Sequence, residues 1–396
     1  MIDSTSISVD KAVGHARRLL SVNPNQPLLM VQLANRLRLV DQLAEALSWA
    51  RWAVRPQPWP DGQVDPRAWR LLGHLLLDVG QFDDAEWIYR QADPSGSQGR
   101  LQHSRARACL GQGHWSEAWA LAEQRWMEPS IAAERPACPH WQGWPQVNQI
   151  TLWDEQGFGD TLQALRWIPE LSRPDLAVTL DVRPPLQRLL QEGLRWLNLE
   201  LTVRSRDQRD WDGFCHGSLL DLPVLLQARS WPDPVVLRWP TSPRAPGRPR
   251  VALVWESGRY LDDPALALEY RRKTIPDAQR IALCAALKAR GIEVVLLQPG
   301  FDLAADADFY QQALLMQRCD LLVSVDTAAA HLGGVIGHPT WLLLPWAAAS
   351  RWRRHIEQTE LYPGMRLLRQ PRHGDWPGLI AQLLRDLEVW LEAVAF

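Results

Sequence analysis

The sequence has few cysteines and a small net charge. Its 396 residues include five cysteines, which are scattered and form neither a C-x-x-C pair nor a histidine-paired spacing. This pattern argues against structural zinc, and unpatterned cysteines suit a reducing compartment. The formal net charge of -2 argues against a nucleic-acid binder.

Long apolar runs and a leader segment are missing as well. The sequence has no signal peptide and no span of about 18 or more apolar residues, so we expect no transmembrane segment. With 46% hydrophobic residues, the chain can bury the cores of two or three domains. We therefore expect a cytoplasmic protein, with peripheral attachment to the inner membrane as the alternative.

Phenylalanine and tyrosine are rare, whereas tryptophan is abundant. The chain has six phenylalanines and five tyrosines but 22 tryptophans, and we interpret most of these as packing residues. Trp346 and Trp352 follow the last apolar strand that we expect, where an indole ring can instead stack on a base or a sugar.

The segment from Leu321 to Pro345 has the pattern of a nucleotide-phosphate site. Residues 321–325 and 341–344 are short, apolar runs typical of buried parallel strands, and one helix fits between them. Asp326 and Thr327 stand at the start of that helix, where unpaired N–H groups favour an anion. His331, one turn further, can add a donor to a diphosphate. The alternative is that Asp326 is only a cap and His331 only a packed ring.

A second segment of the same kind lies at residues 150–171. A short strand is followed by Gly157 and Gly159, which permit a tight turn beside a ligand, and then by an amphipathic helix. Asp160 stands at this strand-to-helix junction, where its carboxylate can act as a general base. Glu155 is a competing base, and the alternative interpretation makes Asp160 an ordinary helix cap.

Both segments belong to an ordered set of motifs that extends from about residue 148 to the C-terminus. In this order the set resembles bacterial tetratricopeptide-repeat proteins that carry a glycosyltransferase domain similar to the lipopolysaccharide heptosyltransferases of glycosyltransferase family 9. The motifs lie at residues 150–171, 251–258, 271–276, 321–345 and 351–376.

The resemblance implies an α/β fold of the GT-B class, with two Rossmann-like halves. It implies that Asp160 is the catalytic base and that the segment of Asp326, Thr327 and His331 binds the donor. Ala328 stands where the heptosyltransferases usually have glycine, so this backbone departs from their pattern. The further donor-binding candidates are Gly157, Gly159, Ser257, Gly258, Arg272, Lys273, Thr274, Gln298, Ala328 and Trp346.

The chemistry that the resemblance implies is an inverting transfer from a nucleotide-sugar without a cofactor or a metal ion. The acceptor is expected to be a glycan, a lipid-linked glycan such as lipopolysaccharide, or a protein. Asp306 and Asp308 have the Asp-x-Asp spacing by which many glycosyltransferases of another fold hold a divalent ion. We interpret them as a solvated helix start, because they precede a helical pattern and do not follow a strand.

The first third of the chain predicts an all-α domain of tetratricopeptide-like repeats. Residues 66–92 match the template of about 34 residues, with Gly73 and Tyr89 at positions where two helices cross closely. Residues 33–53 fit the same template, and residues 106–122 are a weaker copy. We expect these repeats to support the second part of the chain or to guide a protein or glycan acceptor.

Proline-rich joints suggest where the domains divide. Residues 231–250 predict a stiff linker between the two Rossmann-like halves, and the amphipathic helix over residues 379–394 is expected to cross back to the first half. The predicted divisions are helical repeats over 1–126, a linker over 127–147, the first half over 148–240 and the second half over 241–396.

Three functions remain open at this point. The leading one is a glycosyltransferase. A scaffold whose degenerate transferase domain binds a nucleotide without turnover is the alternative, and a pure tetratricopeptide adaptor is the third. A fold inferred by analogy does not decide between these three functions.

Overall fold

The structure is a computed structural model, and the chain divides into two units. The helical unit comprises the chain up to Glu134 together with residues 263–272 and 347–354, and the α/β unit comprises the remainder. The described residues are 4–55, 59, 63–136, 138–143, 147–208, 215–240, 247–258 and 263–393.

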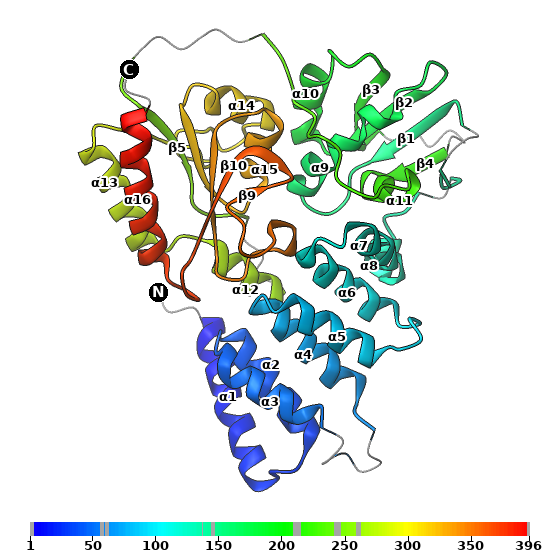
Figure 1. Ribbon diagram of the computed structural model, residues 1–396, viewed down its shortest axis with the longest axis vertical. Coiled ribbons are helices and arrows are strands. Elements are labelled where there is room, and N and C mark those ends of the chain that lie inside the picture. The colour runs from blue at the N-terminus through cyan, green and yellow to red at the C-terminus, as the bar shows by residue number, and fades with distance from the viewer. Residues whose placement is uncertain are drawn as a thin grey trace. The chain divides into compact units, whose positions relative to one another are not determined.

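The helical unit is built from helix hairpins, which Figure 1 shows as successive pairs in blue to cyan. The hairpins pair α2 with α3, α4 with α5 and α6 with α7. A β-carbon added at Gly73 of α4 would lie 2.5 Å from the ring of Tyr89 in α5, so the small residue permits the close crossing that the sequence predicted. The helices are α1 (Ser4–Val22), α2 (Pro27–Leu39), α3 (Leu43–Ala53), α4 (Pro66–Asp78), α5 (Phe82–Ala92), α6 (Gly99–Gln112), α7 (Trp115–Ala122) and α8 (Pro129–Ala132).

The turn inside each hairpin contains one residue in the left-handed region. These residues are Asp41 (φ 67°), Gly80 (φ 70°) and Gly113 (φ 84°). Such a residue ends a helix sharply and leaves the last carbonyl groups of the helix for other donors.

Arginines from the later part of the chain bind these turns. Arg272 forms ion pairs with Asp41 at 2.6 Å and with Asp78 at 3.2 Å. Arg354 donates to the carbonyl oxygens of Val79, at 2.9 Å, and of Gly80, at 3.3 Å. The segments 263–272 and 347–354 are therefore held to the repeats by charge and by hydrogen bonds.

The first Rossmann-like half is a four-stranded parallel sheet in the order β3-β2-β1-β4. The strands β1 and β2 are almost wholly buried, as their apolar β-branched sequences predict. The helix predicted after β1 is shorter than expected: α9 ends at Ala164, and 3-10 turns over Leu165–Trp167 and Pro169–Leu171 continue it. The elements are β1 (Gln149–Trp153), α9 (Phe158–Ala164), β2 (Ala177–Val182), α10 (Pro184–Gly193), β3 (Glu200–Ser205), β4 (Cys215–Ser218) and α11 (Leu222–Leu225).

The second half is a six-stranded sheet in the order β6-β5-β7-β8-β10-β9, in which only β9 is antiparallel to its neighbour. Its strands β7 and β8 are wholly buried, at the two places that the sequence predicted. The elements are β5 (Arg250–Val254), α12 (Pro264–Lys273), α13 (Asp277–Ala289), β6 (Glu293–Leu296), α14 (Phe309–Met316), β7 (Leu321–Val325), α15 (Ala328–Val335), β8 (Thr340–Leu344), β9 (Gln358–Thr359), β10 (Tyr362–Arg369) and α16 (Trp376–Ala393).

One expectation about the second half is wrong. The C-terminal helix α16 does not cross to the first half: Leu379, Leu383 and Leu387 are buried in the core of the six-stranded sheet, and Figure 1 shows α16 beside α13. The apolar face of this helix finds a nearer partner than the sequence suggested.

The linker between the halves is extended where it is described. Leu237 donates its N–H to Val335 at the end of α15, at 2.7 Å, and Arg238 donates to Gly193 at the end of α10, at 3.0 Å. Two Rossmann-like halves after an all-α repeat region confirm the predicted GT-B fold class. Among the described helices, none is long and apolar enough to cross a membrane.

Candidate functional site

The predicted donor-binding residues of the second half gather at one edge of the six-stranded sheet. Because β5, β6, β7 and β8 are parallel, their carboxyl ends meet at the same edge. Ser257 and Gly258 follow β5, Gln298 follows β6, Asp326 follows β7 and Trp346 follows β8.

Two of these side chains have buried oxygen atoms without a partner. Gln298 donates through Nε2 to the carbonyl oxygen of Glu256 at 3.3 Å, which ties the ends of β6 and β5 together. In the described part of the chain, the Oε1 atom of Gln298 and the Oγ atom of Ser257 accept or donate no hydrogen bond. Buried polar atoms are nearly always paired, so both oxygens are suited to a ligand at this edge.

Asp326 is buried beside the start of α15. Its residue is 8% exposed, and no described group forms a hydrogen bond or ion pair with its carboxylate. Thr327 is the N-cap residue and makes no side-chain cap bond, although its Oγ1 lies 3.3 Å from Ser324 Oγ. The structure therefore does not support the alternative interpretation, in which Asp326 is only a helix cap.

His331 is held by a tyrosine that the sequence analysis missed. Its Nδ1 atom lies 2.9 Å from the hydroxyl oxygen of Tyr362, and the two rings meet edge to face. Both residues are almost fully buried. Gly334, one turn further along α15, leaves room for the tyrosine, since a β-carbon there would lie 2.4 Å from its ring. No short motif links residues 331 and 362, so only the fold could identify this pair.

In the first half, Asp160 is the third residue of α9, and its side chain helps to cap the helix, which agrees with the alternative interpretation of this residue. Gly157 is the N-cap residue, and its N–H donates to Oδ2 of Asp160 at 3.0 Å. The preceding Gln156 adopts a left-handed conformation with φ 59°, which completes the tight turn after β1. A carboxylate beside a helix start is stabilised by the partial positive charge there.

The competing base Glu155 is already bonded. It is 3% exposed and accepts a hydrogen bond from the hydroxyl of Ser218 at the end of β4. Its neighbour Asp154 is fully buried and pairs with Arg183 at 2.6 Å and with Arg206 at 3.5 Å. These two acids hold the ends of the four strands together. Asp160 is also hydrogen-bonded, but it is only half-buried, which makes it the more accessible candidate.

The two predicted segments, far apart in the sequence, meet in the structure. Helices α9 and α15 pack together, and a β-carbon added at Gly159 would lie 2.6 Å from Cδ2 of His331. Phe158 also packs on Phe309, with ring centroids 5.1 Å apart. The start of α9, which carries Asp160, thus contacts the histidine of the segment that is predicted to bind the donor.

A buried arginine beside this contact was not identified from the sequence. Arg166 is 2% exposed and donates to the carbonyl oxygens of Leu361 and of Pro232, the latter at 3.4 Å. Its guanidinium also lies over the rings of Trp231, at 5.1 Å, and Tyr362, at 5.6 Å. Burial lowers the pKa of Arg166 below its ordinary value. Arg166 therefore joins the first half to the linker and to the segment before β10.

Several candidates lie away from this group. Arg272, a donor-binding candidate, belongs to the helical unit, where it forms ion pairs with Asp41 and Asp78. Lys273 and Thr274 are half-buried at the end of α12. Trp352 is fully buried in the helical unit, so it is a packing residue and not a stacking platform.

The described residues hold one set of potential metal ligands, and it does not fit a metal. Glu86, Cys109 and Glu117 lie together in the helical unit, but Arg90 pairs with Glu86 at 2.7 Å, and Arg105 pairs with Glu117. Burial, with the two carboxylates adding, raises the pKa of the Cys109 thiol to about 12. The guanidinium groups occupy the carboxylates and the thiol stays protonated.

The Asp-x-Asp pair is a helix start, as predicted. Asp308 is the N-cap residue of α14 and accepts the N–H of Gln311 at 2.7 Å, while the Gln311 side chain accepts the N–H of Asp308 at 2.9 Å. This reciprocal capping explains the residue without a metal ion.

Comparisons with known proteins give distant similarities only. No family model matches the chain, and no curated protein matches it. Among solved structures, the iron-containing dodecameric glycosyltransferase TibC from enterotoxigenic E. coli is 12% identical, with a TM-score of 0.41, over 63% of this chain and 78% of that one. The E. coli ADP-heptose lipopolysaccharide heptosyltransferase II is 12% identical, with a TM-score of 0.39, over 63% of this chain and 100% of that one. A mutant of the Thermobaculum terrenum O-GlcNAc transferase is 13% identical, with a TM-score of 0.33, over 100% of this chain and 95% of that one. Similarities at this level carry no weight for the function of this chain.

Proposed function

We propose that this chain is a glycosyltransferase that transfers a sugar from a nucleotide-sugar donor, with inversion and without a metal ion. Its acceptor is a glycan, a lipid-linked glycan such as lipopolysaccharide, or a protein. The supporting observation is the contact of Gly159 with His331, which brings the helix start that carries Asp160 to the helix that follows Asp326. An inverting transfer needs a base for the acceptor hydroxyl next to donors that stabilise the leaving diphosphate.

Asp160 is the base in this proposal. The N–H of Gly157 holds one carboxylate oxygen, which fixes the direction of the side chain. A carboxylate has about four lone-pair sites, so this bond leaves acceptor capacity for a hydroxyl proton. The base would take that proton as the hydroxyl oxygen attacks the anomeric carbon, and the bond to the leaving phosphate would break on the opposite face.

The leaving diphosphate is assigned to the carboxyl edge of the six-stranded sheet. The start of α15 offers backbone N–H groups behind Thr327, and His331 lies in the same turn. The unpaired oxygen of Ser257 is a hydroxyl, which can donate to a phosphate or accept from a ribose. The unpaired Oε1 of Gln298 is an acceptor and suits a hydroxyl or an amino group of the nucleoside.

The test separates binding from turnover in the full-length chain. A thermal-shift panel of UDP, GDP, ADP, dTDP and CMP, with and without EDTA, should show stabilisation by one nucleotide that survives chelation. Asp326→Ala should abolish that stabilisation. With the matching nucleotide-sugar, Asp160→Asn should lower donor turnover by about 10²–10⁴-fold while it preserves nucleotide binding.

The outcomes distinguish the proposal from its alternatives. Nucleotide binding that depends on Asp326, without donor turnover by the wild type, would indicate the non-catalytic scaffold. The absence of any nucleotide-dependent stabilisation would contradict the donor site itself. Stabilisation that EDTA removes would contradict metal independence alone.

A further inference from the structure

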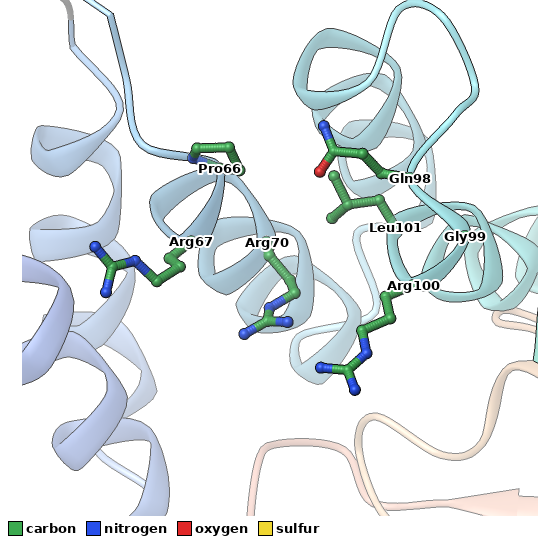
Figure 2. A pocket seen from close by; sticks show the side chains of 7 residues that line it. All are labelled: Pro66, Arg67, Arg70, Gln98, Gly99, Arg100 and Leu101. Atoms are coloured by element: carbon green, nitrogen blue, oxygen red, sulfur yellow. The ribbon is translucent and has the colours of Figure 1, made fainter. Parts of the chain in front are cut away.

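The helical unit contains a cavity of about 260 Å³ between the beginnings of α4 and α6. Pro66, Arg67 and Arg70 of α4 line one side, and Gln98, Arg100 and Leu101 line the other (Figure 2). We infer that this cavity, here called the arginine pocket, binds the carboxylate side chains of an acidic peptide segment. This site lies apart from the strand-end residues proposed for the donor, and it does not depend on the transferase activity.

Two of the three arginines have partners at the surface. Arg67 forms a bidentate pair with Asp65, the N-cap residue of α4, at 2.6 Å, and Arg100 pairs with Glu128 at 2.9 Å. Both side chains of the Arg100–Glu128 pair are exposed, and such a pair contributes about 0–1 kcal/mol, because water and salt screen it. A carboxylate that enters the pocket can therefore replace Glu128 at small cost and share Arg67 with Asp65.

Arg70 supplies the uncompensated charge. It is half-buried, and in the described part of the chain no carboxylate lies within ion-pair distance of it. Figure 2 shows Arg70 between Arg67 and Arg100, with its guanidinium directed to the same side of the helices as that of Arg100. A planar guanidinium in this position offers paired N–H donors that match the two oxygens of a carboxylate.

A further positive charge lies on α6 beyond the pocket. Arg107 is exposed and lies two turns beyond Arg100 on α6, on the same helix face. Burial, followed by the charges of Arg38 and Arg107, lowers the pKa of His74 to about 3, so this histidine is neutral near pH 7.

The lining favours a peptide over a bare anion. Pro66 and Leu101 provide apolar surface for the methylene groups of glutamate, and the Gln98 amide can pair with a peptide group. The cavity is larger than a single phosphate requires. An extended segment with several carboxylates would satisfy the pocket and the arginine beyond it together, whereas inorganic phosphate would satisfy only part of it.

The experiment measures the binding of a fluorescein-labelled hexaglutamate peptide to the full-length protein by fluorescence anisotropy. Arg70→Gln should weaken binding about tenfold or more, the effect of losing one charge-assisted hydrogen-bonded contact. Arg51→Gln is the matched control: it makes the same charge change on α3, at an exposed residue outside the pocket, and should leave binding unchanged. Raising the salt concentration should weaken the wild-type complex.

Further arms decide what occupies the pocket. A hexaglutamine peptide should not bind, and pyrophosphate should compete only weakly with hexaglutamate. Equal binding of wild type and Arg70→Gln, or equal binding of the two peptides, would overturn the inference, and full competition by pyrophosphate would reassign the pocket to phosphate. If Arg70→Gln is less stable to unfolding than the wild type, Arg67→Gln repeats the test at a more exposed side chain.

Discussion

Gly159 and His331 are in direct contact, and a β-carbon on Gly159 would lie 2.6 Å from the imidazole Cδ2 atom. Gly159→Ala should therefore displace either the histidine ring or the start of α9. We expect a loss of about 1–3 kcal/mol in the free energy of unfolding, as for other overpacked sites. The nucleotide-dependent stabilisation should fall with it, and denaturant unfolding with and without nucleotide measures both quantities.

A matched control for this substitution lies in the other half of the same α/β unit. Gly364→Ala adds the same methyl group on β10, where no atom lies within 4 Å of the new β-carbon. This variant should unfold like the wild type and bind nucleotide unchanged. If Gly159→Ala behaves in the same way as Gly364→Ala, the two segments do not touch as described.

Tyr362→Phe tests the hydrogen bond that holds His331. The substitution removes the hydroxyl at 2.9 Å from Nδ1 and keeps the ring that fills the space beside Gly334. We expect a loss of about 1–3 kcal/mol in the free energy of unfolding, because a buried imidazole nitrogen loses its partner.

The nitrogen-15 chemical shifts of the His331 imidazole provide a readout that packing alone does not move. They report which ring nitrogen carries the proton, and Nδ1 should change most in Tyr362→Phe. Unchanged shifts would show that the tyrosine hydroxyl does not set the state of this histidine.

The ion pairs between Arg272 and the repeat turns give a prediction about stability and pH. Burial alone would raise the pKa of Asp78, but Arg38 and Arg272 outweigh burial and hold that pKa below its ordinary value. Asp78→Asn should cost about 3–5 kcal/mol of unfolding free energy near pH 7, because it leaves the partly buried Arg38 without its ion-pair partner and leaves Arg272 with Asp41 alone.

The sign of the pH dependence follows from the lowered pKa. The contribution of Asp78 is fully present above the pKa of the unfolded chain, about 3.9, and is lost as the pH falls through the folded value. The difference between wild type and Asp78→Asn should therefore shrink below about pH 4. In a double-mutant cycle, Arg272→Met and Asp78→Asn should cost less together than the sum of their separate effects; strict additivity would contradict the described pair.

His216 gives a second pH dependence, in the α/β unit. Burial, with the charges of His140 and Arg135 adding, lowers its pKa to about 4. In the unfolded chain His216 takes up a proton near pH 6.5, whereas in the folded chain it stays neutral at that pH. The stability that the neutral histidine contributes is therefore fully present above about pH 6.5 and declines as the pH falls toward 4. His216 alone should lower the unfolding free energy by about 2 kcal/mol between pH 7.5 and 5.

His216→Asn removes this titration and can retain the local bond. The asparagine carbonyl can accept the indole N–H of Trp153, which now donates to Nδ1 of His216 at 3.2 Å. Chemical unfolding of both proteins at several pH values measures the change in slope. An identical pH profile in the two proteins would show that His216 does not titrate in this range.

The sequence by itself determined the local structure and the placing of the motifs. The apolar runs at residues 321–325 and 341–344 became the buried strands β7 and β8, because a parallel strand covered on both faces must be apolar along its whole length. Gly73 permitted the close crossing of a repeat hairpin, and Asp308 capped a helix, since both effects depend on neighbours along the chain. The resemblance of the ordered motifs led to the GT-B fold class that the two sheets confirm.

Only the tertiary structure decided which distant residues meet. His331 finds Tyr362 and Gly159, and Arg166 finds the carbonyl oxygens of Pro232 and Leu361, through contacts that no local spacing encodes. Arg272 illustrates the same limit: the resemblance made it a donor-binding candidate, but the fold places two carboxylates of the repeats beside it. A charged side chain pairs with the nearest desolvated counter-charge, and which counter-charge is nearest depends on how the whole chain packs.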